Sequence, residues 1–286
     1  MSDLYVGFRT IEVNDSLVST LNAEQKIEIW DKRLALYPNM YVELRSLDVD
    51  KHVSMGRVDA TGNFVEKIEI PDLGGDLAPR NREQAFALHA LMDDRIPVVV
   101  LTGTAGTGKT ILTLAAAIKK IEQRQYAKAI ITRPMSQVGK YQLGALPGGI
   151  DEKFNPYLMN YVTNLEQFVG PGNVTDLIDQ CRLEAMPLQL FRGASFNKCF
   201  VIADEMQVCD HMEILTVGTR IGEGSKLVIM GDLNQRDERI AKEKTGLHKL
   251  MTDRKIKESP LVAAIELIKC ERSETARLFA EVFEEK

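Results

Sequence analysis

The segment from residue 103 to residue 110 constrains this chain more than any other part of its sequence. It follows a run of apolar residues at 98–101 and leads into residues 111–117, whose composition is typical of a helix. The segment matches the pattern G-x-x-x-x-G-K-[ST], in which glycines let the backbone curl until successive N–H groups face one phosphate group. Its residues are Gly103, Thr104, Ala105, Gly106, Thr107, Gly108, Lys109 and Thr110. The sequence therefore predicts a strand, a phosphate-binding loop and a helix, in that order.

The last two residues of this loop have separate predicted roles. Lys109 is expected to reach the β- and γ-phosphates of ATP, and Thr110 is expected to bind Mg²⁺ through its hydroxyl group. A glycine-rich turn that matches the pattern by chance is the alternative, and the strand before it and the helix after it argue against that alternative. The predicted cofactors are ATP and Mg²⁺.

Two acidic residues, Asp204 and Glu205, end a second apolar run at residues 200–203. The carboxyl ends of parallel strands line the ligand crevice of such a sheet. Asp204 is therefore predicted to hold magnesium, and Glu205 to polarise the water that attacks the γ-phosphate. An Asp-Glu pair that only caps a helix is the alternative. A Glu after the magnesium-binding Asp favours hydrolysis over phosphoryl transfer to a small substrate.

A third apolar run ends in Gly231 and the residues up to Gln235. The Gln235 amide is predicted to lie near the γ-phosphate, where it would distinguish ATP from ADP. The alternative is an ordinary turn between a strand and a loop.

Five short, continuously apolar runs predict strands that are buried on both faces of a parallel sheet, with helices as the crossovers. The runs lie at residues 98–101, 129–131, 199–202, 227–230 and 265–268. The predicted fold class is thus α/β, a parallel sheet covered by helices, over residues 78–286.

Residues 1–77 have a different pattern and are predicted to form a small α/β or β-rich N-terminal appendage. Strands are expected at 40–44 and 63–68, with a turn at 59–62, and a helix is expected at 22–36. Residues 71–76 combine Pro, Gly and Asp, so they are the predicted linker.

Composition excludes several classes of function. A net charge of −5 and a pI near 5.6 argue against a broad basic face for nucleic acid. The four cysteines and four histidines lack the spacing of a zinc site. No apolar stretch is long enough to span a membrane, so the expected protein has no membrane partner and is cytoplasmic.

Further segments resemble the PhoH family of ATPases in order and spacing. The resemblance covers residues 81–272, roughly two thirds of the chain. The matching segments are residues 132–134, 143–149, 152–158, 191–195, 204–207, 219–222 and 231–235.

This resemblance implies a fold similar to the first motor domain of superfamily 1 helicases. It implies an additional strand between the loop-bearing strand and the strand that ends in Asp204, and residues 129–131 fit that strand. It also implies that Gln84 contacts adenine, with a helix-surface glutamine as the alternative. Met206, Val208 and the pair Ala194-Ser195 depart from the family pattern, which leaves the coupling to a polymer or partner in doubt.

Family members are similar to ring-forming ATPases, so a homo-oligomeric ring, commonly a hexamer, is implied. In such rings an arginine of one subunit enters the site of its neighbour. Arg272 is the first candidate and Arg220 the second, and an exposed or salt-bridging arginine is the alternative for each.

Two further expectations concern nucleic acid. Lys140, Tyr141 and Gln142 lie in a glycine-flanked stretch that could contact single-stranded RNA or DNA, or form a subunit interface.

Some relatives carry a PIN ribonuclease domain ahead of a segment that resembles residues 4–9. Here the chain begins at that segment, so no intrinsic nuclease activity is expected.

The leading hypothesis is thus a magnesium-dependent ATPase that is helicase-like and stimulated by RNA or DNA. The alternative is a nucleotide-dependent oligomerisation or interaction protein with slow turnover.

Overall fold

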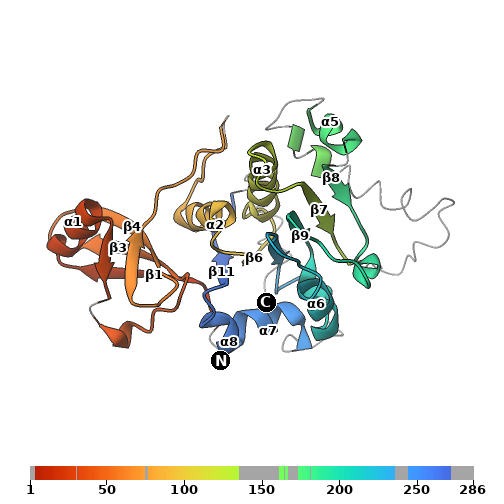
Figure 1. Ribbon diagram of the computed structural model, residues 1–286. Helices are drawn as coiled ribbons and strands as arrows, with labels where there is room; N and C mark the ends of the chain where they lie inside the picture. The colour runs from red at the N-terminus through yellow and green to blue at the C-terminus, as the bar shows by residue number, and fades with distance from the viewer. Residues whose placement is uncertain are drawn as a thin grey trace, which may run out of the picture.

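The computed structural model describes residues 4–29, 31–74, 77–134, 161–163, 165–166, 173–180, 182–235 and 244–271. Two sheets organise these residues, a five-stranded sheet near the N-terminus and a six-stranded sheet in the rest of the chain (Figure 1). The N-terminal elements are β1 (Phe8–Val13), α1 (Asp15–Glu24), β2 (Lys26–Glu28), η1 (Lys32–Leu34), β3 (Tyr41–Ser46), β4 (Val53–Val58) and β5 (Phe64–Lys67). The others are α2 (Arg82–Met92), β6 (Val98–Gly103), α3 (Lys109–Glu122), β7 (Lys128–Thr132), α5 (Asn173–Asp179), β8 (Leu183–Ala185), η2 (Leu188–Phe191), β9 (Cys199–Ala203), η3 (Met206–Val208), α6 (His211–Gly218), β10 (Lys226–Gly231), α7 (Gly246–Thr252), α8 (Arg254–Lys257) and β11 (Val262–Leu267).

The six-stranded sheet has the order β11-β6-β10-β9-β7-β8, and its neighbouring strands are parallel. Successive side chains of each strand enter different cores, because the side chains of a strand alternate between its two faces. In β9, Phe200 and Ile202 pack in the core that includes α2 and α3. Val201 and Ala203 pack in the core that includes α6 and α7. Helices therefore cover both faces of the sheet, which confirms the predicted α/β fold class.

Two details of the predicted sheet are wrong. Residues 129–131, in β7, precede the Asp204 strand in the chain but lie on its far side in space, and β10 occupies the place between β6 and β9. The last strand covers Val262–Leu267 rather than residues 265–268, since residues 262–264 already pair with β6. Strand order depends on pairing between distant segments, which local patterns do not encode.

The N-terminal sheet has the order β1-β3-β4-β5-β2 and packs on α1, so this part of the chain is β-rich with one helix. The helix predicted at residues 22–36 is wrong. The helix there, α1, ends at Glu24 because Gln25 takes a left-handed conformation, and residues 26–28 then pair with β5 as a strand. The boundary at residue 77 stays a prediction.

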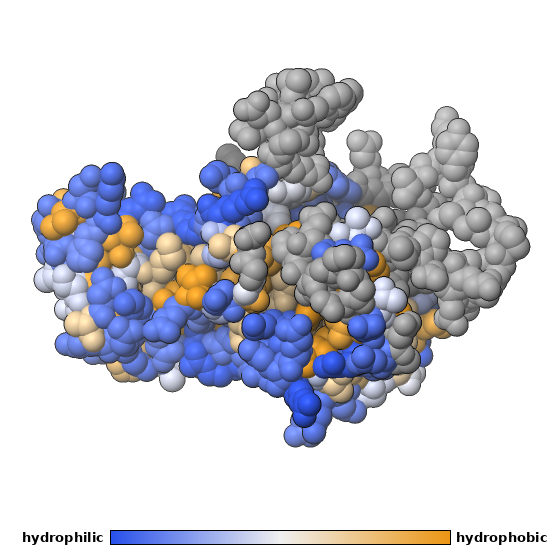
Figure 2. Space-filling view, turned by 90° about the horizontal axis from the view of Figure 1, so that it is seen from above, coloured by the Kyte–Doolittle hydropathy of each residue, from blue (hydrophilic) through white to orange (hydrophobic). Residues whose placement is uncertain are grey.

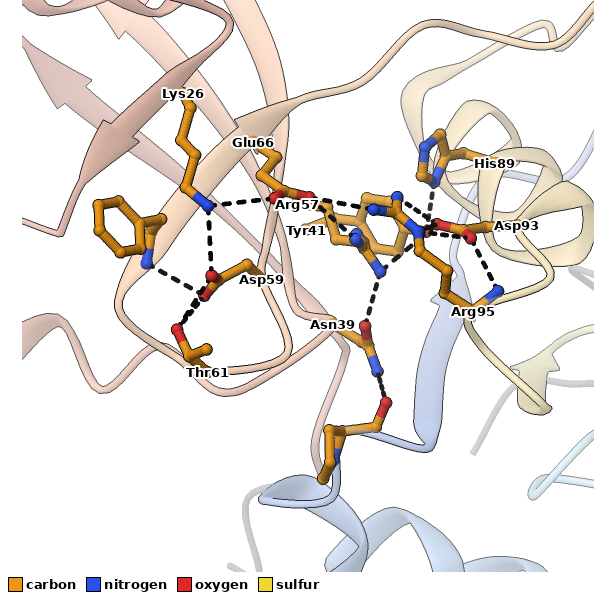
Figure 3. A network of polar contacts seen from close by, with 12 residues as sticks. Lys26, Asn39, Tyr41, Arg57, Asp59, Thr61, Glu66, His89, Asp93 and Arg95 are labelled. Carbon is orange, nitrogen blue, oxygen red and sulfur yellow. Dashed lines mark hydrogen bonds and ion pairs between the residues drawn. The ribbon is translucent and has the colours of Figure 1, made fainter.

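The N-terminal sheet is docked on α2 (Figure 3). The Tyr41 ring stacks on Phe86, with 4.9 Å between ring centroids, and its hydroxyl lies 2.9 Å from Nδ1 of His89. Beside it, the buried Arg57 guanidinium contacts Glu66 at 3.1 Å and Asp93 at 3.5 Å. Aromatic packing and paired charges thus attach the N-terminal sheet to α2.

A buried lysine fixes the other end of α2. Lys226 begins β10, and its side chain is fully enclosed. Its ammonium group donates hydrogen bonds to the carbonyl oxygens of Ala90, Asp93 and Ile96, each at 2.8 Å. These are carbonyls at the C-terminus of α2 and in the turn before β6, so Lys226 joins the helix to the centre of the sheet.

Hydrophilic residues cover much of the described surface in the view of Figure 2, and hydrophobic residues appear there in separate patches. None of the helices in the described part of the chain is long and apolar enough to cross a membrane.

Candidate functional site

The loop between β6 and α3 is held in shape by its own hydrogen bonds and by its neighbours. Gly103 has φ 142°, and a Cβ atom there would lie 2.2 Å from the carbonyl oxygen of Leu267, so only glycine fits. The Thr107 hydroxyl donates to the Thr104 carbonyl at 2.9 Å. The Lys109 ammonium donates to the carbonyl oxygens of Gly103 and Thr104 at 2.6 and 2.9 Å. The loop therefore folds around the lysine at the start of α3.

A cavity of about 270 Å³ opens beside this loop, where the carboxyl ends of β6, β9 and β10 meet. It is lined by Ala105, Gly106, Gly108, Lys109, Thr110, Ile111, Asp204, Glu205, Gly231, Asp232 and Gln235. The three sequence motifs thus contribute to one cavity. Gly103, Thr104 and Thr107 belong to the loop but do not line this cavity.

Gln84 supports the loop from outside the cavity. Its side-chain amide donates to the Thr107 carbonyl at 3.0 Å, and its side-chain oxygen accepts from the Arg80 backbone N–H at 2.8 Å. Gln84 is 5% exposed, and it lies in the first turn of α2 after the N-cap residue Asn81. The structure therefore places Gln84 against the phosphate loop, and its contact with adenine stays a prediction.

The chain after β11 also contacts the loop. The Glu271 backbone N–H donates to the Gly106 carbonyl at 3.0 Å, and its carboxylate accepts from the Asn81 side-chain amide at 2.9 Å. Arg272, the first candidate for the arginine that acts across an interface, lies outside the described residues. Arg220 follows α6, does not line the cavity, and buries its Nε atom without a hydrogen-bond partner within the described structure.

Asp204 is 6% exposed at the end of β9 and accepts two hydrogen bonds through different oxygens. Oδ1 accepts from the Glu205 backbone N–H at 2.9 Å, and Oδ2 accepts from the Tyr161 hydroxyl at 2.9 Å. Burial raises the pKa of Asp204, the neighbouring Glu205 carboxylate raises this pKa further, and the two hydrogen bonds oppose the rise. The carboxylate is thus a buried group whose direction is fixed by donors.

Glu205 adopts a left-handed backbone conformation with φ 57°, which is unfavourable for a residue other than glycine and occurs often at functional sites. Its carboxylate accepts a hydrogen bond from the Gln207 side-chain amide at 2.7 Å. The Gln207 side-chain oxygen accepts from the Asp232 backbone N–H at 3.2 Å. A Cβ atom on Gly231 would lie 2.6 Å from that oxygen, so the glycine leaves room for this bridge.

Gln207 and Asp232 are site residues that the sequence analysis did not assign. Both lie inside matched segments, residues 204–207 and 231–235, and that position was the available signal. Their roles depend on a contact between the ends of β9 and β10, and strand order could not be derived from the sequence. Asp232 lines the cavity, and Gln207 hydrogen-bonds both to the Asp232 backbone and to the Glu205 carboxylate.

The oxygen donors at the cavity fit a magnesium ion. Mg²⁺ prefers hard oxygen ligands and is usually held by one or two protein oxygens together with phosphate and water. The Thr110 hydroxyl and the Asp204 carboxylate both line the cavity. Within the described ranges no cluster of three or more His, Cys, Asp or Glu could hold a metal ion.

A phosphate loop between a parallel strand and a helix, facing the acidic end of a second strand, defines the class of P-loop NTPases. Within that class the chain belongs to the PhoH family, because the family model described as PhoH-like protein matches residues 76–284.

Curated relatives carry the same family name. Protein PhoH2 of Bacillus subtilis is 33% identical over 290 residues, which cover 98% of this chain and 64% of the relative. Protein PhoH2 of Mycolicibacterium smegmatis is 33% identical over 287 residues, with 98% and 63% covered. The chain thus spans slightly less than two thirds of the length of these relatives. Among solved structures, the SWI2/SNF2 ATPase core of Sulfolobus solfataricus in complex with dsDNA matches with a TM-score of 0.43 at 11% identity, covering 68% of this chain and 40% of that one.

Proposed function

We propose that this protein binds ATP with Mg²⁺ in the cavity beside the phosphate loop and hydrolyses the ATP. One observation carries the proposal: Lys109, Thr110, Asp204, Glu205 and Gln235 come from three separate segments and line a single cavity. A cation, two hydroxyl or carboxylate ligands for a metal, a second carboxylate and an amide are the groups that phosphoryl transfer to water requires.

The loop and the start of α3 would hold the phosphates. Backbone N–H groups of the loop and the positive end of the α3 dipole attract negative charge, and Lys109 adds a full positive charge. Thr110 and Asp204 would hold the magnesium ion, which neutralises charge on the phosphate oxygens when bound. The electrostatic interaction of each of these groups with the transferred phosphoryl group becomes stronger as negative charge develops on that group.

Glu205 would orient and polarise the attacking water. Its carboxylate is held by the Gln207 amide at 2.7 Å, so its other oxygen has a defined direction. Gln207 also contacts the backbone of Asp232, close to Gln235, which we propose lies near the γ-phosphate. Gln207 therefore connects Glu205, which would activate water, with the segment that carries Gln235.

Replacing Lys109 with Ala tests the nucleotide site. We expect ATP to bind about 30- to 100-fold more weakly, because charge-assisted hydrogen bonds contribute about 1.5–3 kcal/mol each. Titration calorimetry with ATP, with and without Mg²⁺, measures the change. Lys119→Ala, in the last turn of the same helix, is the control and should bind ATP as the unaltered protein does. Equal ATP affinity in the Lys109 variant, or absence of magnesium-dependent affinity in the unaltered protein, would contradict the proposal.

Assembly into a ring, with an arginine that acts on the neighbouring site, belongs to the same proposal. Lys109→Ala subunits mixed with Arg272→Ala subunits are expected to recover ATP hydrolysis, since some shared sites then contain both intact groups. The same mixture with Arg220→Ala compares the second candidate. No recovery in either mixture, with the solution mass of the ring unchanged, would count against an arginine that acts between subunits.

The nucleic-acid part of the proposal rests on the resemblance alone. Lys140, Tyr141 and Gln142 lie outside the described residues. Stimulation by single-stranded RNA or DNA, helicase-like use of ATP and the lack of nuclease activity stay predictions. Phosphate release and strand cleavage, measured against a panel of RNA, DNA and no nucleic acid, test them together.

A further inference from the structure

Tyr161 is a core residue that reaches the proposed metal site. It lies in a short helical stretch at residues 161–163, is 4% exposed, and packs in the core shared by α2 and α3. Its hydroxyl group donates to Oδ2 of Asp204 at 2.9 Å. The two residues are far apart in the chain, and no sequence motif assigns a role to this tyrosine.

The hydrogen bond from Tyr161 completes the support of Asp204. The aspartate is also held by its backbone N–H, which donates to the Thr132 carbonyl at 2.8 Å, and by the Glu205 N–H on Oδ1. Among the hydrogen bonds of the described residues, the one on Oδ2 comes from another segment, through the Tyr161 hydroxyl, and the positive charge of Arg133 also acts on this carboxylate. Each carboxylate oxygen can accept a further interaction after one hydrogen bond, so both oxygens keep capacity for a ligand.

We propose that Tyr161 is a positioning residue for magnesium: its hydroxyl group holds the Asp204 carboxylate in the orientation in which it lines the same cavity as Thr110. This inference rests on the proposed function, because it concerns the metal that ATP would bring. Removal of a group that orients a metal ligand typically lowers metal affinity or activity by about 10- to 100-fold. Without the hydroxyl, the buried carboxylate can rotate away from the direction that a small octahedral ion requires.

The chain supplies a matched control. The Tyr126 hydroxyl also donates to a carboxylate, Oδ1 of Asp94 at 3.1 Å, and Tyr126 is 6% exposed. Neither Tyr126 nor Asp94 lines the cavity. Tyr161→Phe and Tyr126→Phe therefore remove the same kind of hydrogen bond from a packed ring, once at the proposed metal ligand and once away from it.

The experiment measures ATP binding as a function of magnesium concentration, together with the electron paramagnetic resonance spectrum of Mn²⁺ bound with ATP. We expect Tyr161→Phe to need about tenfold more Mg²⁺ for half-maximal enhancement of ATP affinity, and to change the Mn²⁺ spectrum. ATP affinity without metal should stay the same. Tyr126→Phe should leave both metal readouts unchanged. Thermal unfolding of each variant establishes that the protein is folded.

A double substitution guards against a purely structural effect. In an Asp204→Asn background, Tyr161→Phe should cause no further change in the magnesium dependence. The reason is that the Tyr161 hydroxyl acts on magnesium through the Asp204 carboxylate, which this background lacks. The inference is overturned if Tyr161→Phe keeps the magnesium dependence of the unaltered protein, if Tyr126→Phe shifts it equally, or if the two substitutions are additive. Failure of the proposed function looks different, since the unaltered protein would then show no magnesium-dependent ATP affinity at all.

Discussion

A Glu205→Gln variant is expected to hydrolyse ATP about a thousandfold more slowly than the unaltered protein, because general acid–base groups typically contribute 10²–10⁴ in rate. The substitution keeps the size of the side chain and an oxygen that can accept the hydrogen bond from Gln207, but it removes the charge that polarises water. ATP affinity should stay within about threefold, since the phosphates are held by other groups. Steady-state phosphate release and titration calorimetry measure the two quantities.

Glu223→Gln is the control for this variant, because Glu223 is exposed and lies outside the cavity. It removes one negative charge and should leave the hydrolysis rate unchanged. If the unaltered protein hydrolyses ATP no faster than the Glu205 variant, hydrolysis is not its main activity. A nucleotide-dependent interaction protein with slow turnover would then be the better description.

A Lys226→Met variant is expected to lose about 4 kcal/mol of unfolding free energy, because three carbonyl groups each lose the hydrogen bond from the ammonium group while the volume of the side chain is nearly kept. The Ala90 carbonyl lies in the last turn of α2, where no backbone N–H of the helix can replace the ammonium group. The Asp93 carbonyl keeps its hydrogen bond from the Ile96 backbone N–H. Urea unfolding, with the slope compared between variants, measures the loss.

Lys120→Met separates this effect from the loss of any buried lysine. The Lys120 ammonium is also enclosed, but its partner Asp94 is 46% exposed and can be hydrated when the lysine is gone. The expected loss is about 1 kcal/mol. Equal destabilisation by the two substitutions would show that the three carbonyls do not account for the effect of Lys226.

The parts of the fold that local pattern determines could be predicted. The loop at residues 103–110, the apolar strands and the acidic pair after β9 each depend on neighbours in the chain, because side-chain polarity and backbone freedom are local properties. The same locality explains the error at residues 22–36, where the composition suits a helix but pairing with β5 makes residues 26–28 a strand.

The parts that depend on distant segments could not be predicted. The place of β10 between β6 and β9 determines that Gln207 meets Asp232, and nothing within residues 204–207 indicates that contact. The same holds for Tyr161 beside Asp204 and for Lys226 beneath α2. In each case one polar side chain satisfies groups that become neighbours only when the chain is folded.

The N-terminal sheet is attached to the rest of the chain through α2 and, separately, through the start of β11, where the Asn39 amide donates to the carbonyl oxygens of Pro260 and Val262. The 11 residues of α2 extend about 16 Å. Near the beginning of the helix, Gln84 donates a hydrogen bond to the Thr107 carbonyl, and farther along Phe86 and His89 contact Tyr41. Deletion of the first 77 residues would expose the Phe86 ring and remove Arg57 from Asp93. The helix that contacts the loop would then lose part of its packing surface. We therefore expect the loop to keep its present shape only when the N-terminal sheet is present.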